Sequence, residues 1–143
     1  MHSSLLVAYR RRVMIDCGLD WLGRINEVRP AAIVITHAHP DHAWGLKEGA
    51  PCPVYASAET WDVLSAYPVE QMIIPPRRRT GICGIDFEAF PVDHSTRAPA
   101  AGYRVSAGRA AFFYARFAEI ELMAKERGVR AMVAFDGMEE VIP

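Results

Sequence analysis

The chain has 143 residues, of which 51% are hydrophobic and 23% are charged, and its formal net charge is −1. This length predicts one domain over residues 1–143, large enough to bury a core without disulfides. The balanced charge excludes a globally basic nucleic-acid binder and an acidic disordered tail, and no apolar run reaches the roughly 18 residues that span a bilayer.

The cysteines and the N-terminus further limit the kinds of protein that this sequence can encode. Cys17, Cys52 and Cys83 form no Cys-x-x-Cys pair, so the sequence supports neither a disulfide framework nor a thiolate zinc ribbon. The N-terminus has no basic region before its short apolar stretch, so it is not typical of a signal peptide. We therefore expect a cytoplasmic α/β protein with no membrane partner.

The first half of the chain alternates short apolar runs with polar links, which predicts several strands and one helix. The expected strands in this half are residues 5–9, 13–17, 31–36 and 53–56. The first two are joined by three arginines and are typical of a hairpin, whereas the third is continuous and β-branched, as in a strand buried on both faces. Ser57 is the expected N-cap of a helix that ends near Tyr67.

The second half continues with apolar or alternating runs. They are residues 72–74, 82–92, 102–105, 110–114 and 129–135, of which the last four are expected strands. Gly108 is expected in the turn before 110–114. Phe117, Ile120 and Ala124 lie at helical spacing and predict a helix over 117–127 that ends before Gly128.

Residues 36–42, Thr-His-Ala-His-Pro-Asp-His, carry the clearest chemical signal. His37, His39 and His42 lie within six residues of one another, together with Asp41. Imidazole suits zinc and related transition metals, and a carboxylate can complete such a site. Because burying four such groups without a partner is costly, this segment after a buried strand predicts a metal site.

The segment His37-x-His39-x-Asp41-His42 resembles the signature of the metallo-β-lactamase fold hydrolases. Residues 14–18 resemble the strand-ending Asp-x-Gly of that family, and residues 91–95 resemble the strand end that supplies its third metal-binding histidine. The resemblance covers most of residues 2–115. It implies an α/β (α+β) fold, a four-layer αββα sandwich, which is incomplete here in its C-terminal half.

The resemblance also implies a set of metal ligands. His37, His39 and His94 would form one zinc site. Asp41 and His42 would contribute to a second site that binds its ion weakly. Zinc is the expected ion, with Mn²⁺ or Fe as alternatives.

Three histidines and a water molecule form a catalytic zinc arrangement, in which the metal lowers the pKa of the water to about 7. The expected activity is therefore hydrolysis by attack of a metal-bound hydroxide. Asp41 is the expected catalytic residue, because it could orient or deprotonate the water. Asp16 either orients the ligand loop or only forms the turn at its strand end. Ser95 and Arg97 could bind an anionic substrate or simply belong to a loop.

The chain departs from the family pattern after the third histidine motif. The family has an aspartate that bridges the metals and a final histidine, but no histidine follows His94 here and no aspartate lies between His94 and Asp136. Phe117 stands near the position of the expected aspartate. Glu119, Glu121 and Asp136 are the acidic residues considered as replacements. We therefore expect a truncated or internally shortened domain.

The substrate class and two alternatives stay open. Residues 93–95 and 136–138 look more like the ribonuclease Z, ribonuclease J and phosphodiesterase side of the superfamily, so the expected substrate is a small-molecule or nucleic-acid phosphodiester or another ester. The chain could instead be a non-catalytic remnant or binding module, or it could bind nucleic acid through the arginines of residues 10–12 and 77–79. A shortened sandwich would leave sheet edges uncovered, which predicts a homodimer or poor solubility.

Overall fold

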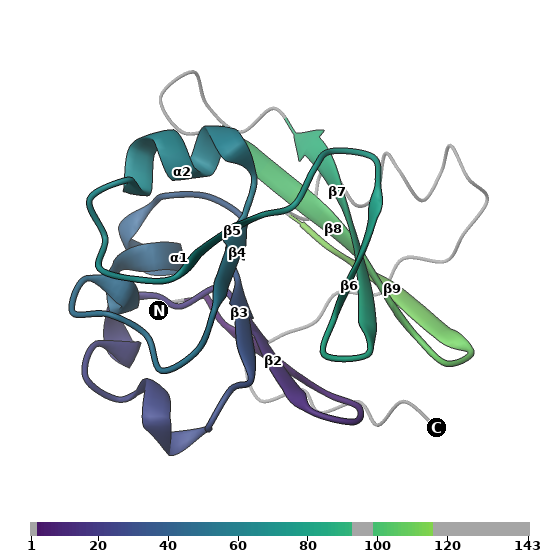
Figure 1. The fold of residues 1–143 in the computed structure, drawn as a ribbon, viewed down its shortest axis with the longest axis horizontal. Coiled ribbons are helices and arrows are strands. Elements are labelled where there is room, and N and C mark those ends of the chain that lie inside the picture. Colours follow the sequence, from purple (N-terminus) through teal and green to yellow (C-terminus); the bar gives the residue numbers. More distant parts are fainter. Residues whose placement is uncertain (1–2, 93–98, 116–143) are drawn as a thin grey trace.

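Two β-sheets pack face to face, and short helices cover the outer face of one of them (Figure 1). The computed structural model describes residues 3–92 and 99–115. The first sheet has the order β1-β2-β3-β4-β5, with β1 antiparallel to β2 and the other neighbours parallel. Its strands are β1 (Leu5–Ala8), β2 (Arg12–Ile15), β3 (Ala32–Val34), β4 (Val54–Ala56) and β5 (Gln71–Ile73).

The second sheet is antiparallel throughout, in the order β6-β7-β8-β9. Its strands are β6 (Arg79–Ile82), β7 (Ile85–Val92), β8 (Ala100–Ala107) and β9 (Ala110–Tyr114). The helical elements are α1 (Pro40–Ala43), α2 (Ala58–Leu64) and three short 3-10 turns, η1 (Leu19–Trp21), η2 (Ile25–Glu27) and η3 (Trp44–Leu46).

Two apolar cores explain this layering. In β2, Val13 and Ile15 face the second sheet, where they pack with Phe87 and Tyr103, whereas Met14 faces the helices. Because successive side chains of a strand point to opposite faces, a strand that is apolar at every position needs a layer on each side. The central strands are therefore enclosed by the helices on one face and by the second sheet on the other.

The structure confirms most of the expected strands and corrects two details. Residues 82–92 are not one strand, because Cys83 and Gly84 both have positive φ values, 54° and 84°, and turn the chain between β6 and β7. Two positive φ values in succession are the mark of a tight hairpin turn, and a cysteine is an unusual residue there. Ser57 caps α2 as expected, by accepting a hydrogen bond from the backbone N–H of Thr60, but the helix ends at Leu64.

Some predictions lie outside the described residues. They are the helix at 117–127 and the strand at 129–135. Within the described part of the chain, no helix is long and apolar enough to cross a membrane. The cytoplasmic location, the homodimer and the extent of the domain over residues 1–143 stay predictions.

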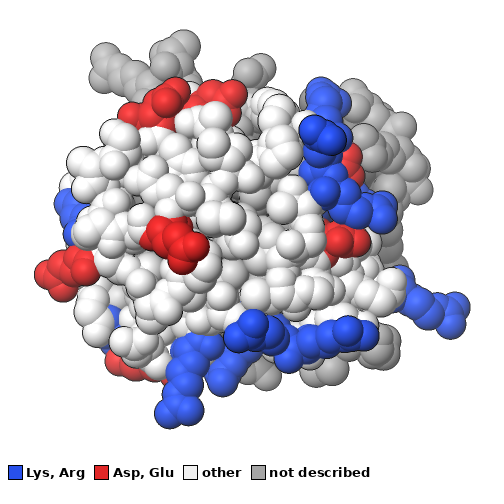
Figure 2. Space-filling model, viewed as in Figure 1, with Lys and Arg blue, Asp and Glu red and all other residues white. Residues whose placement is uncertain are grey.

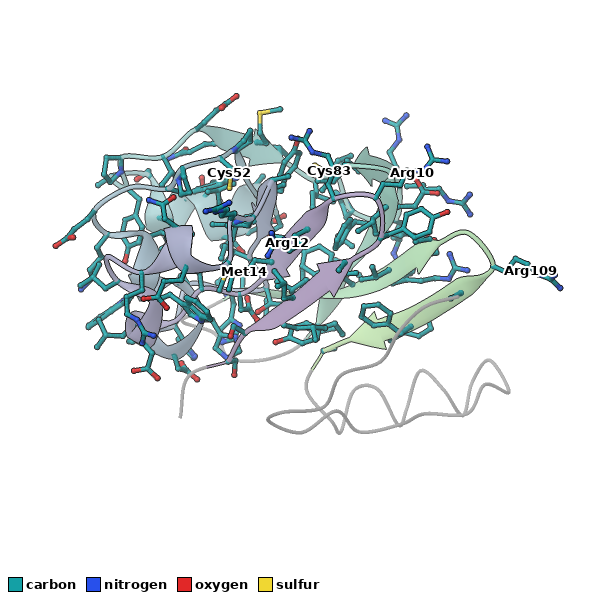
Figure 3. All side chains as sticks on the ribbon, turned by 90° about the horizontal axis from the view of Figure 1, so that it is seen from below. Arg10, Arg12, Met14, Cys52, Cys83 and Arg109 are labelled. Atoms are coloured by element: carbon teal, nitrogen blue, oxygen red, sulfur yellow. The ribbon has the colours of Figure 1, made fainter. Side chains whose placement is uncertain are left out.

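The strands define two opposite ends of the molecule. The strands β2 and β3 both lead into polar residues, Asp16 and Thr36, and the backbone N–H of Ala101 donates to the carbonyl of Thr36 at 2.9 Å. The β1–β2, β6–β7 and β8–β9 turns lie at the other end, where Arg10, Cys83 and Arg109 are labelled in Figure 3. The histidine segment thus lies at the carboxyl ends of parallel strands, where ligand sites of open α/β sheets form.

Candidate metal centre

The histidine segment leaves β3 and folds back on itself through α1. His39 has an extended backbone (φ −66°, ψ 154°) and Pro40 is the first helical residue. Proline suits this position, because its φ is preset and its missing N–H would have no helical partner there. The carbonyl of His39 then accepts hydrogen bonds from the N–H groups of His42 and Ala43, at 3.0 and 2.9 Å. This short turn brings His42 back beside His37, with 4.0 Å between their ring centroids.

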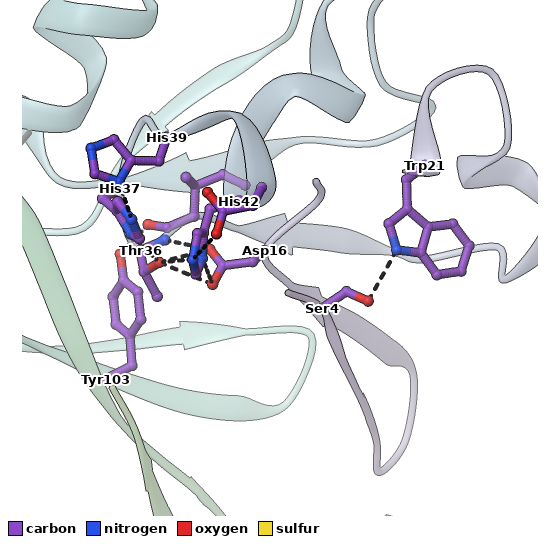
Figure 4. Close-up of polar contacts among 10 residues, drawn as sticks. Ser4, Asp16, Trp21, Thr36, His37, His39, His42 and Tyr103 are labelled. Carbon is purple, nitrogen blue, oxygen red and sulfur yellow. Dashed lines mark hydrogen bonds and ion pairs between the residues drawn. The ribbon is translucent and has the colours of Figure 1, made fainter. Parts of the chain in front are cut away.

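Asp16 is the buried centre of the arrangement (Figure 4). It is fully buried, and its φ of 60° lies in the left-handed region that aspartate tolerates better than most residues. Its carboxylate accepts hydrogen bonds from the backbone N–H of Thr36 at 2.8 Å and from the Thr36 hydroxyl at 2.9 Å. Nδ1 of His42 lies 2.7 Å from the other carboxylate oxygen. These bonds stabilise a charge that would otherwise be costly to bury.

The hydrogen-bond network assigns the histidine tautomers. An ionised carboxylate only accepts, so the Thr36 hydroxyl donates to Asp16 and the Nδ1 atom of His42 must carry a proton. The Thr36 hydroxyl has no second hydrogen, so Nδ1 of His37, 2.9 Å away, must donate to it. Both imidazoles, when neutral, then have their lone pair on Nε2.

The Nε2 atoms of these two histidines face further donor atoms. Nε2 of His37 lies 3.2 Å from Nδ1 of His39, and Nε2 of His42 lies 3.3 Å from Oδ2 of Asp41. Two ligands at about 2.0–2.1 Å from one tetrahedral zinc ion lie about 3.3 Å apart. Both pairs therefore fit the spacing of atoms that share a metal ion, and the buried Asp16–Thr36 network holds the first member of each pair.

The described residues alone do not form a complete metal site. Among residues 3–92 and 99–115, no group of three or more His, Cys, Asp or Glu side chains is arranged to hold a metal ion. His94, Ser95 and Arg97 lie outside the described residues. The side chain of Asp41 is 47% exposed and that of His42 is 17% exposed, so the pair borders solvent.

Thr36 and Tyr103 take part in this arrangement, although the sequence did not single them out as site residues. Thr36 connects Asp16 to His37 through one hydroxyl. Tyr103, fully buried in β8, donates from its hydroxyl to the carbonyl of Ile35 at 2.8 Å and so ties the second sheet to the end of β3. Burial, with the charge of Asp16 as a second cause, raises the pKa of Tyr103 above its usual range, which keeps this donor protonated.

Gly45 is a third residue without a sequence signal. A Cβ atom built there would lie 2.7 Å from Sγ of Cys17 and 2.7 Å from the carbonyl oxygen of Gly18. Its N–H donates to the carbonyl of Cys17 at 2.9 Å, and the N–H of Cys17 donates to the carbonyl of His42. Only glycine allows this close approach, which fixes the helical end of the histidine segment to the loop after Asp16.

The chain was compared with known protein families, curated proteins and solved structures. The sequence model of the Beta-lactamase superfamily domain matches residues 11–136. No curated protein matches the chain.

Solved structures share the fold at low sequence identity. The metallo-β-lactamase fold protein YhfI from Bacillus subtilis is 14% identical, with a TM-score of 0.61 over 78% of this chain and 53% of its own. MEM-A1, a subclass B3 metallo-β-lactamase from a soil metagenome library, is 19% identical, with a TM-score of 0.61 over 80% and 56%. A diphosphatase from the PhnP family is 28% identical, with a TM-score of 0.61 over 85% and 56%. The chain thus spans about half the length of each of these proteins.

Proposed function

The chain belongs to the β-lactamase superfamily and has the metallo-β-lactamase fold, and from that premise we propose that it is a metal-dependent hydrolase of a phosphodiester or another ester. The observation that carries the proposal is the network around Asp16. It holds His37 and His42 with their Nδ1 protons directed inward and their Nε2 atoms directed at His39 and Asp41. Histidines that bind metals almost always donate their other ring N–H in this way.

The proposed ligands follow from the two donor pairs. His37 and His39 would hold one zinc ion together with His94, and Asp41 and His42 would hold a second ion more weakly. A divalent ion held by these residues would supply Lewis acidity, by which it would acidify water and polarise an ester oxygen of the substrate. Asp16 acts through Thr36 and His42, because it fixes their orientation and has no exposed surface with which to reach a substrate.

Asp41 is the proposed proton acceptor. Its half-exposed carboxylate can reach solvent, and its Oδ2 atom lies beside Nε2 of His42. A carboxylate in this place can accept the proton of the attacking water and orient that water toward the substrate. Ser95 and Arg97 are the proposed contacts of an anionic substrate.

The substrate class is supported by one relative. The PhnP-family structure is a diphosphatase and is 28% identical over 85% of this chain. Phosphate esters are therefore the first substrates to test.

The test is hydrolysis of bis(p-nitrophenyl) phosphate by the metal-loaded protein, with His39→Ala as the disabling variant. His2→Ala is the matched control, because His2 lies outside the motif. We expect turnover that EDTA abolishes, that zinc restores and that His39→Ala lowers by at least about 100-fold. Equal activity in both variants would overturn the proposal, because the hydrolysis would then not depend on the motif.

A second candidate is a metal-binding module without catalysis. It is favoured by the sequence between His94 and Asp136, which has no aspartate to bridge two metals. This candidate predicts that zinc binds and is lost in His39→Ala, while phosphodiester and carboxylic ester panels show no turnover.

A further inference from the structure

A cavity of about 400 Å³ lies at the end of the strands opposite the histidines. Four arginines line it, together with Tyr9: they are Arg10, Arg11, Arg12 and Arg29. We propose that this cavity binds the phosphate backbone of a single-stranded nucleic acid. The site is separate from the proposed metal centre, because β2 begins at Arg12 and reaches Asp16 only after its last residue.

The charge of this surface points to an anionic ligand. All four arginines are exposed, and within the described part of the chain none of them forms an ion pair with a carboxylate. Figure 2 shows Lys and Arg side chains gathered along the lower edge of the molecule. Because the whole chain has a net charge of only −1, this is a local positive field that can steer a polyanion. Guanidinium groups bind phosphate with two parallel hydrogen bonds, which makes arginine the preferred residue for such contacts.

The backbone around the cavity is held in place. The N–H of Ala31 donates to the carbonyl of Arg12 at 2.8 Å, which joins the segment of Arg29 to the start of β2. Tyr9 reaches the β8–β9 turn, where a Cβ atom on Gly108 would lie 3.3 Å from its hydroxyl. The arginines are therefore presented from segments that the fold has already brought together, and little backbone ordering is needed on binding.

The arrangement favours a chain of phosphates over a single anion. The arginines come from two separate segments, and Arg109 projects from the neighbouring β8–β9 turn (Figure 3). A flexible single strand can bring successive phosphates into a concave cavity, whereas a rigid duplex presents its phosphates on a convex surface. An acidic protein partner is less favoured, because apart from Tyr9 the apolar residues of the cavity are only two alanines and a proline, and protein interfaces have a larger apolar centre.

The test is fluorescence anisotropy with a labelled oligothymidylate of about 20 nucleotides, in EDTA so that the proposed metal centre does not contribute. Four phosphate contacts predict a slope of log affinity against log salt of about −2.8, or about a 50-fold loss of affinity between about 50 and 200 mM NaCl. The double variant Arg11→Gln, Arg12→Gln removes two contacts, so its slope should be about −1.4 and its loss about sevenfold.

Two further variants keep this test decisive. Arg78→Gln with Arg79→Gln removes the same charge from another arginine triplet and should leave the wild-type slope unchanged. Arg11→Lys with Arg12→Lys keeps the charge and should also keep the slope. The circular dichroism and thermal unfolding of all three double variants should match the wild type, because the side chains at positions 11, 12, 78 and 79 are exposed.

Four results would overturn the proposal. They are no binding at about 50 mM NaCl, an equal loss of slope in the Arg78 and Arg79 variant, displacement by inorganic phosphate at about 10 mM, and binding of poly-glutamate of the same length as tightly as the oligonucleotide. The third result would indicate a site for a single anion, and the fourth would indicate a site for an acidic protein.

Discussion

The substitution Asp16→Asn tests both roles of this buried carboxylate, which accepts hydrogen bonds from Thr36 and fixes the tautomer of His42. Asparagine has the same shape but presents an amide N–H₂ where one carboxylate oxygen stood. Whichever way the amide turns, two donors then face each other, unless His42 moves its proton from Nδ1 to Nε2. That change of tautomer would remove the lone pair that Nε2 directs at Asp41.

The size of the effect follows from the bonds that are lost. Hydrogen bonds to a charged group contribute about 1.5–3 kcal/mol each, and the amide oxygen keeps some of the bonds to Thr36. We therefore expect Asp16→Asn to lower the free energy of unfolding by about 2–4 kcal/mol. Loss of the support for a ligand typically lowers metal affinity by about 10–100-fold, and we expect zinc affinity to fall within that range.

The assays are urea unfolding of the metal-free protein and competition for zinc with a chromophoric chelator. Asp62→Asn is the matched control, because Asp62 is exposed on α2 and its change should shift the free energy of unfolding by less than about 0.5 kcal/mol. If Asp16→Asn behaved like the control in both assays, the hydrogen-bond network would have no part in stability or metal binding, and the tautomer argument would be wrong.

Three other substitutions test neighbouring features. Thr36→Val removes the hydroxyl between Asp16 and His37 and should cost about 1–3 kcal/mol in urea unfolding, whereas Thr36→Ser should keep most of the stability and zinc affinity. Gly45→Ala should lower the melting temperature, because the added Cβ atom would clash at a cost of about 1–3 kcal/mol. Gly81→Ala is the control and should leave the melting temperature unchanged, because its Cβ atom would lie 3.7 Å from its nearest neighbour. Equal melting temperatures for the two variants would contradict this packing. Burial, and secondarily the charge of Asp16, raises the pKa of the Cys17 thiol from 9.0 to about 12. The unfolded chain therefore loses this proton first, so the free energy of unfolding should fall as the pH rises above 9. Burial also raises the pKa of Cys52, to about 11. Cys17→Ala should therefore make the fall shallower, by up to about 1.4 kcal/mol per pH unit, in urea titrations from about pH 8 to 10.5.

Strands with an uninterrupted apolar pattern could be located from the sequence. β3 is buried on both faces, and its β-branched run is what such a strand requires. The hairpin of β6 and β7 cannot be located from the sequence, because the dipeptides that signal a two-residue turn are Asn-Gly, Asp-Gly and Gly-Gly, and Cys83-Gly84 is none of these. Helix α1 was also missed, since it has only four residues and no apolar period can be read over that length.

The candidate site also has one part that the sequence predicts and one part that it does not. The donor atoms of His37, His39, Asp41 and His42 are close in sequence, so their convergence could be expected from the motif. The contacts of Asp16 could not be derived from spacing, because they join residues 20 and 26 positions apart. They depend on the parallel register that pairs Ile15 with Val34, which is set by the packing of both cores rather than by any local pattern.

Whether the histidine motif binds a metal ion is best tested by the metal content of the protein, purified without a histidine tag or chelator and analysed for zinc, manganese and iron. The proposed metal centre should hold about one zinc ion tightly per chain, which His39→Ala loses and His2→Ala keeps. No retained metal in the wild type, even after zinc is supplied in excess, would contradict this prediction.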